Sequence, residues 1–421
     1  MKVGIIGSGG REHAMCLALN KSNNIGQIYC FPGNAGTASI AKNVSLNLEN
    51  FNELKNFILS NNIELIVVGP EKPLVDGIVD FLESNGINVF GPNKAASQLE
   101  GSKIFTKNLC KKYKIPTAKF GIFKNTKDAN TFLNKTNFPL VIKADGLASG
   151  KGVYICSNKK EAKIGIKEIF EGKFGEAKNL LIEEFLEGEE MSYFIITDGK
   201  TIKKFQTAQD HKRVLEGDKG KNTGGMGAYS PSRLINDKLE KKILEKIIEP
   251  TIKGLRDIGI EYKGFLYAGL MIIKDEPYLI EYNVRMGDPE CQTILPKLNS
   301  DIFDIILACC NAKLNSTTIK WHDKKSLCVV LCSKGYPDDF NKNVLIEGID
   351  KLKFSQGEHC YHAGTNKIDG KIYSTGGRVL NFVCLSENFL KSRIRIIEII
   401  KILDWDGGFF REDIGYKVID E

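Results

Sequence analysis

The sequence lacks the features that mark membrane, secreted and disulfide-rich proteins. Its 421 residues contain no uninterrupted apolar run near the roughly 18 residues that a membrane-spanning helix requires. The opening MKVGIIGSGGREH has a much shorter apolar stretch than the core of about 7 to 15 residues in a secretory signal peptide. The 11 cysteines include no C-x-x-C pair, and Cys309 and Cys310 are adjacent, which suits buried free thiols. These absences predict a cytoplasmic protein without membrane association.

A zinc-type site has one weak candidate. The metal-like cluster in the sequence consists of His359, Cys360 and His362 with Cys328 and Cys332. Because this spacing fits alternating strand positions as well as any pattern of zinc ligands, we expect a structural role for these residues.

Arginine is scarce, with nine residues among the 59 basic ones, and the net charge of +7 is spread along the chain. Asp and Glu are interleaved with the lysines, and no block of five or six like charges occurs. This distribution argues against a nucleic-acid-binding tail and favours small anionic substrates. Arg11, Arg213, Arg285 and Arg378 lie in glycine-rich loops, where a guanidinium group can grip phosphate or carboxylate, although chance also places arginines in loops.

The length allows two to four domains. Residues 1–101 alternate apolar strands with helical segments, which predicts a parallel sheet with crossover helices. The expected strands are 3–6, 27–31, 65–68 and 88–90, and the expected helices are 11–22, 51–61 and 73–85. Ligands of such sheets bind at the carboxyl ends of the strands, where the loops are 7–13, 32–36 and 69–73.

A dinucleotide-binding domain is the alternative for this region. Gly7 and Gly9 match the first two glycines of G-x-G-x-x-G, but Glu12 stands in place of the third. No acid follows the second strand after Phe31 to hold a ribose hydroxyl. Both departures argue against NAD and leave a glycine turn at a helix amino terminus, a site for one phosphate beside Arg11.

Two further regions follow. In residues 102–325 we expect Ser102 to cap a helix reaching about residue 113. Strands are expected at 139–143, 153–156, 180–185, 192–197, 264–273 and 278–283. Residues 326–421 open with the strand CVVLC, carry glycine-marked turns at 362–365 and 374–378, and close with a helix near 387–402.

The stretch KADGLASGKGV (143–153) looks like a phosphate-binding loop but departs from the Walker pattern. Asp145 occupies the place of the first glycine, and Gly152 that of the magnesium-binding hydroxyl. Because apolar strands flank the stretch on both sides, it predicts a glycine-rich flap between antiparallel strands that could fold over a triphosphate.

Two later segments carry carboxylates at strand ends. LLIEEFLEGEEMS (180–192) ends in an acidic cluster, and YLIEYNVRMGDPE (278–290) places Glu281 and Asn283 on one face of a strand, with Arg285 beyond them. A carboxylate and an amide oxygen are hard ligands that suit magnesium. Taken singly, such loops are often plain turns and such clusters are often solvated, so the order of the segments decides the interpretation.

That order resembles the ATP-grasp superfamily and, within it, the family of phosphoribosylamine-glycine ligases, over the whole chain. The motifs are GGREHA (9–14), PGNAGTA (32–38), VGPE-x-PL (68–74), LEGSK-x-FTK (99–107), IKADGLASGKGV (142–153), EEFLEGEE (183–190), QDHKR (209–213), NTGGMGAYSP (222–231), GFLYAGL (264–270), EYN-x-R-x-GDPE (281–290), and HAGT with GGRV (362–379). QDHKR and NTGGMGAYSP are specific to this family within the superfamily.

The resemblance implies an α/β and α+β multidomain protein. It consists of an N-terminal parallel-sheet (pre-ATP-grasp) domain at 1–101, an ATP-grasp domain at 102–325 and a mixed α/β C-terminal domain at 326–421. A small mobile lid subdomain is expected at about 120–187.

The implied reaction joins glycine to 5-phosphoribosylamine through glycyl phosphate, with ATP and Mg²⁺ or Mn²⁺, in de novo purine biosynthesis. Phosphoryl transfer needs mainly positioning and charge neutralisation, which fits the absence of a Ser-His-Asp or Cys-His arrangement. The alternative is another ATP-grasp carboxylate-amine ligase or a carboxylase that phosphorylates bicarbonate. Glycine and phosphoribosylamine are the expected small-molecule partners, with no nucleic acid or membrane and with a monomer or weak dimer as the assembly.

The resemblance also implies residue roles. Nucleotide contacts fall on Lys103, Lys107, Lys143, Gly146, Ser149, Gly150, Gly152, Glu183, Leu186 and Glu190. Substrate contacts fall on Gly9, Gly10, Arg11, Asn34, Glu71, Asp210, Lys212, Arg213, Arg285 and Arg378. Lys143, Asp210 and Arg285 are the expected catalytic residues, and Glu281 and Asn283 the metal ligands. The preceding strand GFLYAGLMII lacks the additional magnesium acid of many ATP-grasp enzymes, and EYNVRMGDPE departs from the usual EFNCRFGDPE without loss of the ligand pair.

Overall fold

The N-terminal region of the computed structural model is a parallel sheet in the order β3-β2-β1-β4-β5. The structure describes residues 1–147, 152–175, 177–403 and 405–419. The strands are β1 (Lys2–Gly7), β2 (Gln27–Pro32), β3 (Lys42–Asn43), β4 (Leu65–Val68) and β5 (Asn88–Phe90), and the helices are α1 (Gly10–Leu19), α2 (Phe51–Ser60), α3 (Glu71–Asp76), α4 (Ile78–Glu83) and α5 (Gln98–Gly101). The segment expected as one helix over 73–85 is divided at Gly77, whose φ of +97° suits glycine.

Both faces of this sheet are buried, as a parallel sheet covered by helices requires. Val3 and Ile5 of β1 belong to one apolar cluster, whereas Ile6 belongs to another, because successive side chains point to opposite faces. The first cluster also contains Phe265 and Val329 from the middle and last regions of the chain. The N-terminal sheet therefore shares its core with the rest of the molecule.

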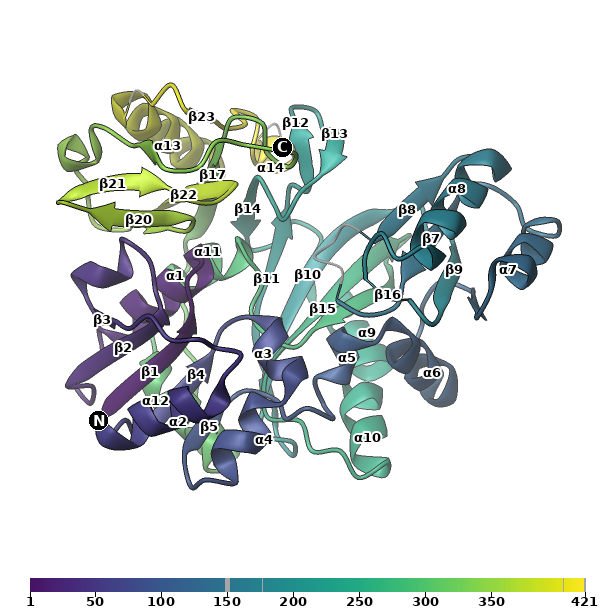
Figure 1. The fold of residues 1–421 in the computed structure, drawn as a ribbon, viewed down its shortest axis with the longest axis horizontal. Helices are drawn as coiled ribbons and strands as arrows, with labels where there is room; N and C mark the ends of the chain where they lie inside the picture. Colours follow the sequence, from purple (N-terminus) through teal and green to yellow (C-terminus); the bar gives the residue numbers. More distant parts are fainter. Residues whose placement is uncertain (148–151, 176, 404, 420–421) are drawn as a thin grey trace.

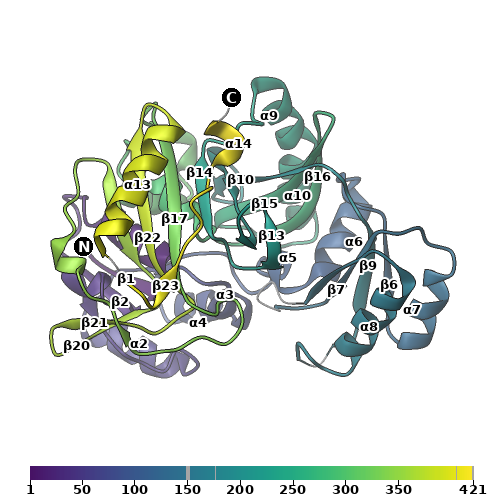
Figure 2. The ribbon, with the colours of Figure 1, turned by 90° about the horizontal axis from the view of Figure 1, so that it is seen from above.

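The lid is a separate antiparallel sheet in the order β6-β9-β7-β8. Its elements are β6 (Phe120–Phe123), α7 (Thr126–Leu133), β7 (Leu140–Ala144), β8 (Val153–Cys156), α8 (Lys159–Phe170) and β9 (Leu180–Glu184), and α6 (Lys103–Tyr113) precedes it. Ser102 caps α6, since its hydroxyl accepts a hydrogen bond from the backbone N–H of Phe105 at 3.1 Å, as expected. Figure 2 shows the lid standing away from the N-terminal and C-terminal regions.

The largest sheet runs from the middle region into the C-terminal region. Its order is β16-β15-β10-β11-β14-β17-β22-β19, and β23 pairs with β17. The strands are β10 (Glu189–Thr197), β11 (Ile202–Asp210), β14 (Gly227–Ser230), β15 (Gly264–Ile273), β16 (Glu276–Asn283), β17 (Lys325–Ser333), β19 (Glu358–His362), β22 (Arg378–Ser386) and β23 (Gly408–Phe409). β14 and β17 pair antiparallel, with Gly227 opposite Val329, and so join the two regions (Figure 1).

The remaining elements cover this sheet or form small additions to it. They are the hairpin β12 (Arg213–Leu215) and β13 (Lys219–Asn222), the small sheet of β18 (Val344–Leu345), β20 (Thr365–Ile368) and β21 (Lys371–Ser374), and the helices α9 (Asp237–Ile243), α10 (Glu249–Asp257), α11 (Glu290–Ile294), α12 (Ile302–Cys310), α13 (Phe389–Leu403) and α14 (Tyr416–Ile419). Across the described ranges, no helix has both the length and the apolarity needed to cross a bilayer. The predicted α/β and α+β architecture is confirmed, whereas the boundaries at 101 and 325 stay predictions.

Candidate active site

The glycine-rich stretch is the connection between two antiparallel strands, as predicted. Lys143 lies opposite Val153 across β7 and β8, and the backbone N–H of Ala144 donates to the carbonyl of Gly152 at 2.9 Å. Asp145, which stands where the Walker pattern has a glycine, uses its side chain to bind α6. Its carboxylate accepts hydrogen bonds from the Ser102 hydroxyl and from the N–H of Ile104, both at 3.2 Å. The flap is therefore anchored to the start of α6. Ser149 and Gly150 lie outside the described residues.

Lys103, the first residue of α6, donates from Nζ to the carbonyl of Gly146 at 2.9 Å. Gly146 has a φ of +100°, a conformation that an L side chain rarely adopts, so this turn depends on glycine. Burial lowers the pKa of Lys103, and the carboxylate of Glu281 opposes that shift while Lys143 adds to it. Lys103 thus contacts the flap through a hydrogen bond and lies near enough to Glu281 for that carboxylate to affect its pKa.

A buried carboxylate joins the other two predicted phosphate-binding lysines. Glu183 of β9 lies 2.9 Å from Nζ of Lys107 and 2.9 Å from Nζ of Lys143, and all three side chains are at most 7% exposed. Burial alone would raise the pKa of the Glu183 carboxyl, but the two ammonium groups hold it below its ordinary value. Nζ of Lys107 also donates to the Thr117 hydroxyl at 2.5 Å. The side chain of Glu183, which the resemblance assigned to nucleotide binding, therefore holds two lysines in the structure.

The predicted metal ligands, Glu281 and Asn283, lie at the end of β16. Glu281 stands opposite Gly269 of β15, where the glycine leaves room beside the glutamate side chain, and Asn283 is buried. The side chain of Lys212 is 35% exposed, and the carboxylates of Glu190, Asp210 and Glu281 keep its pKa well above the ordinary value although desolvation opposes this. Lys103 and Lys212 thus both lie near enough to Glu281 to interact with its charge.

Arg285 is held by two carboxylates from the N-terminal region. Its Nη2 donates to Glu100 at 2.8 Å, and its Nε donates to Glu71 at 3.3 Å. The other carboxylate oxygen of Glu100 accepts from the N–H of Val284 at 2.8 Å. Burial raises the pKa of the Glu100 carboxyl to about 7, although Arg285 opposes the shift. One acid therefore fixes both the Arg285 side chain and the backbone next to Asn283.

Asp210, at the end of β11, lies in a partly buried polar cluster. Burial raises the pKa of its carboxyl to about 7; Lys212 opposes that shift, and the carboxylates of Glu290 and Glu190 add to it. Lys212 forms an ion pair with Glu190. The Ser192 hydroxyl lies 2.8 Å from the Tyr267 hydroxyl and 3.3 Å from Glu290. A carboxyl group that titrates near neutral pH can take up or release a proton under physiological conditions.

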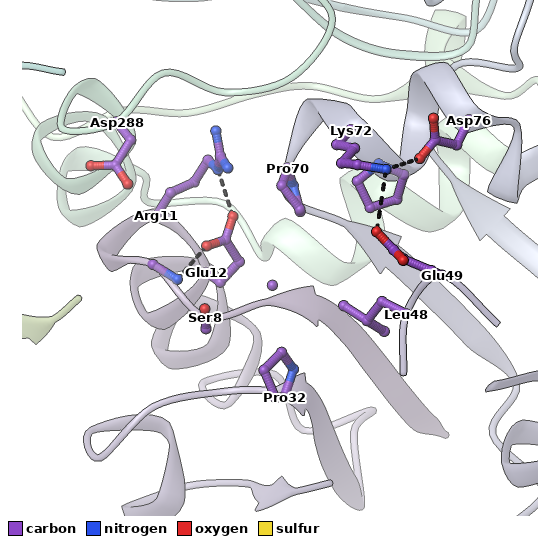
Figure 3. Close-up of a pocket in the computed structure, with 13 residues that line it drawn as sticks. Ser8, Arg11, Glu12, Pro32, Leu48, Glu49, Pro70, Lys72, Asp76 and Asp288 are labelled. Atoms are coloured by element: carbon purple, nitrogen blue, oxygen red, sulfur yellow. Dashed lines mark hydrogen bonds and ion pairs between the residues drawn. The ribbon is translucent and has the colours of Figure 1, made fainter. Parts of the chain in front are cut away.

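A cavity of about 440 Å³ opens at the carboxyl ends of the N-terminal strands. Figure 3 shows Glu12 at its base and Lys72 toward its rim. Glu12 accepts from the N–H of Gly9 and from Nε of Arg11, both at 2.6 Å, and a side chain at Gly7 or Gly69 would collide with it. The amide expected to receive a phosphate is therefore already bonded to a carboxylate, and Arg11 is ion-paired, with Nη1 donating to the carbonyl of Met286 at 3.1 Å.

Asn34 ties the N-terminal loops to the C-terminal region. Its Nδ2 donates to the carbonyls of Ser8 and His362, both at 2.8 Å, and its Oδ1 accepts from the backbone N–H groups of Gly36 and Thr37. The side-chain amide is fully used within the protein, which makes Asn34 a positioning residue.

Other predicted residues also contact the protein. Nη1 of Arg378 donates to the carbonyls of Gly224 and Asp288, at 2.7 and 2.6 Å. Nη1 of Arg213 donates to the carbonyl of Gly220 at 2.7 Å. Gly10 packs so closely against Asn381 that an added Cβ would lie 2.4 Å from Nδ2. Leu186 lies just beyond β9, half-buried.

The segment from Glu281 to Glu290 connects these clusters. It carries the metal pair, then Arg285, then Met286 against Arg11, and then Asp288 at the cavity wall. The sequence suggested roles for the acid and the arginine of this segment, which stay predictions, but it suggested none for Glu12, Glu100 and Asp145. Glu12 is in the first turn of α1, where carboxylates commonly cap a helix, but Asp145 follows a strand and carries no such local signal. Nowhere in the described part of the chain do three or more His, Cys, Asp or Glu side chains form a metal-binding group.

Comparisons with known proteins agree with this geometry. Models of the phosphoribosylglycinamide synthetase N domain, ATP-grasp (A) domain and C domain match residues 1–100, 101–291 and 326–417. A phosphoribosylamine–glycine ligase from Brucella melitensis is 44% identical over 421 residues, which is 100% of this chain and 99% of the relative.

Two solved structures are similar over nearly the whole chain. The crystal structure of a phosphoribosylamine–glycine ligase from Thermotoga maritima has a TM-score of 0.86 at 34% identity, covering 99% of this chain and 100% of that one. The biotin carboxylase domain of a Hydrogenobacter thermophilus 2-oxoglutarate carboxylase, solved with ADP, magnesium and bicarbonate, has a TM-score of 0.74 at 17% identity, covering 97% and 91%, and shares the fold alone. The chain belongs to the phosphoribosylglycinamide synthetase family, and it is an ATP-grasp ligase.

Proposed function

We propose that this cleft joins glycine to 5-phosphoribosylamine with hydrolysis of ATP to ADP and phosphate. The observation that carries the proposal is the convergence of three lysines at the flap strand: Nζ of Lys103 donates to the carbonyl of Gly146, and Lys107 and Lys143 share the carboxylate of Glu183. A nucleotide held by these lysines would have its terminal phosphate next to Arg285, beyond the metal pair. The family supplies the choice of substrates.

Two bond exchanges complete the reaction. A carboxylate oxygen of glycine attacks the γ-phosphorus, the bond to the β–γ bridging oxygen breaks, and ADP leaves. The amine of phosphoribosylamine then attacks the carbonyl carbon of glycyl phosphate, the carbon–oxygen bond breaks, and phosphate leaves with the electron pair. Lys143 and Arg285 neutralise charge on the transferred group, which is the main need of phosphoryl transfer.

Asp210 is the proposed acceptor of the proton that the sugar amine loses. Its carboxyl has a pKa raised by burial to about 7, so it is partly ionised at neutral pH and can act as a general base. Lys212, two residues along, places a positive charge beside it that can hold a substrate anion. The cavity above Glu12 is the proposed place for the ribose phosphate. Lys72 at its rim is ion-paired with Asp76 but exposed, so its ammonium group is accessible to a phosphate.

Glu281 and Asn283 are the proposed ligands of Mg²⁺ or Mn²⁺. Their carboxylate and amide oxygens suit such an ion, and phosphate oxygens and water would complete its coordination. When bound, the metal would neutralise phosphate charge. The geometry fits, because the carboxylate is held at a strand end beside a glycine that leaves space for it.

The test measures ADP release with glycine or bicarbonate as the acid, with and without freshly made phosphoribosylamine. We expect release that depends on glycine and is stimulated by the sugar amine; release that depends on bicarbonate would establish a carboxylase. Glu281→Ala should abolish turnover without lowering the melting temperature. Glu276→Ala, on the same strand but in surface ion pairs with Lys242 and Lys246, is the matched control. Wild-type rates in Glu281→Ala would disprove the metal assignment.

A further inference from the structure

The last part of the chain lies against the loop that carries Asp210 and Lys212. Residues 411–417 follow β23 and include the first two residues of α14, and residues 210–213 run from the end of β11 to the start of β12. Figure 1 shows this hairpin beside α14, far in sequence but adjacent in space. The contact joins a stretch near the C-terminus to a loop of the proposed substrate site.

Arg411 is the centre of this contact. Its side chain is 1% exposed, and Nε and Nη2 grip both carboxylate oxygens of Asp413 at 2.7 Å each. The remaining nitrogen, Nη1, donates to the carboxylate of Asp218 and to the carbonyl of Arg213, both at 2.9 Å. A lysine ammonium could not make this planar, multiple grip. The Arg411 guanidinium thus holds the start of the hairpin directly.

Asp218, at the turn of the hairpin, accepts from several donors. Its Oδ1 accepts from Arg411, and its Oδ2 accepts from the Tyr416 hydroxyl at 2.9 Å and lies 3.2 Å from Nζ of Lys417. Burial opposes ionisation, but hydrogen bonds from His211 and Arg411 hold the pKa of the Asp218 carboxyl far below its ordinary value. Its φ of +54° is the left-handed conformation, which aspartate tolerates in turns. The turn is therefore fixed by the segment it faces.

His211 is the residue between Asp210 and Lys212, and its ring faces the clamp. Nε2 accepts from the N–H of Gly415 at 3.0 Å, so that nitrogen carries no proton. The proton is therefore on Nδ1, which lies 3.3 Å from Asp218 Oδ1. The backbone of His211 is also fixed, because its N–H donates to Gly227 at 2.9 Å and its carbonyl accepts from Met226 at 2.8 Å.

From this geometry we propose that residues 411–417 are a positioning clamp for the loop 210–213. The clamp touches no reacting atom in this arrangement. It holds His211 and the Arg213 carbonyl, and because these flank Lys212 and follow Asp210, it sets where those two side chains project. The inference rests on the proposed function, since it assigns the C-terminal segment a part in binding glycine and the sugar amine.

The test compares Arg411→Lys with Arg395→Lys, a surface arginine of the same region that is ion-paired to Glu358. Arg411→Lys should raise KM for glycine or phosphoribosylamine about 10- to 100-fold, as small misplacements of binding groups do. The dissociation constant of ADP should stay unchanged, and backbone amides over 211–222 should exchange hydrogen faster. Arg395→Lys should change none of these. Tyr416→Phe removes one hydroxyl contact to Asp218, so it should raise KM and speed hydrogen exchange less than Arg411→Lys does. This variant tests the clamp if Arg411→Lys does not fold.

Two results would overturn the clamp. One is an unchanged KM for both substrates in a folded Arg411→Lys enzyme. The other is a loss in which ADP affinity and the melting temperature fall together with activity, which indicates a general structural role. Failure of the proposed function is distinguishable, because it would appear in the unmodified enzyme as an absence of glycine-dependent ADP release.

Discussion

Removing the charge of Glu183 tests how the two lysines beside it are held. Glutamine has the same size, so Glu183→Gln leaves no cavity. It removes the negative charge that lies 2.9 Å from Lys107 and 2.9 Å from Lys143, so these buried ammonium groups lose their counter-charge. At an effective dielectric constant of about 20, each contact is worth about 6 kcal/mol before desolvation is subtracted. Removing one partner of a buried pair typically costs about 3–5 kcal/mol, and we expect a loss of unfolding free energy in that range at pH 7.

The pH dependence gives this prediction its sign. In the variant the folded-state pKa of Lys107 should lie below 10.5, because burial already lowers it and the carboxylate of Glu183 no longer opposes that shift. The deficit should therefore shrink as pH rises from about 7 toward 10.5, where the unfolded chain also loses the proton. Urea denaturation at several pH values measures it. The exposed Glu187→Gln should change stability by less than about 0.5 kcal/mol. A loss of unfolding free energy below about 1 kcal/mol at pH 7, or a loss that is the same at every pH, would refute the reasoning.

Three further predictions concern residues that hold the site together. Glu100→Gln should lower kcat about 10- to 100-fold without changing ATP affinity, because Arg285 then keeps only the longer contact with Glu71 as an ion pair; equal kcat in steady-state kinetics would contradict this. Gly36→Ala should cost about 1–3 kcal/mol in urea denaturation, because the added carbon would lie 2.1 Å from Cε1 of His13, and unaltered stability would rule out that contact. Unfolding free energy should fall as pH drops below 6.5, because burial lowers the pKa of His13 to about 3 and the unfolded chain binds the proton more readily. His13→Asn should flatten that slope, and a parallel slope would show that other groups cause it.

The local elements could be predicted from the sequence because their signals are local. The period of apolar residues located β1, β4 and β15, and the hydroxyl of Ser102 marked the start of α6. The spacing of Lys143 and Gly152 between two apolar strands was sufficient to predict an antiparallel flap. The break at Gly77 was missed because apolar residues continue on both sides of it.

The partners of charged groups could not be predicted, because they come from distant segments. Glu100 and Arg285 are separated by 185 positions, and nothing near either residue indicates the other. Asn34 was expected to contact substrate. Its loop motif does not reveal that the side-chain amide donates hydrogen bonds to carbonyls of the N-terminal and C-terminal regions. Likewise, the strand CVVLC was recognisable, but its pairing with β14 across the expected boundary at 325 was not.

The pairing of β14 with β17 also limits how the chain could be divided. A break between them would leave two strands with unpaired backbone groups, and such edges recruit other chains and aggregate. The regions before and after residue 325 should therefore fold well only in one polypeptide or as fragments that reassociate through this strand pair. The four lid strands pair only with one another within the described ranges, so side chains such as Lys107 and Glu183, and no strand pairing, attach the lid sheet to the rest of the chain.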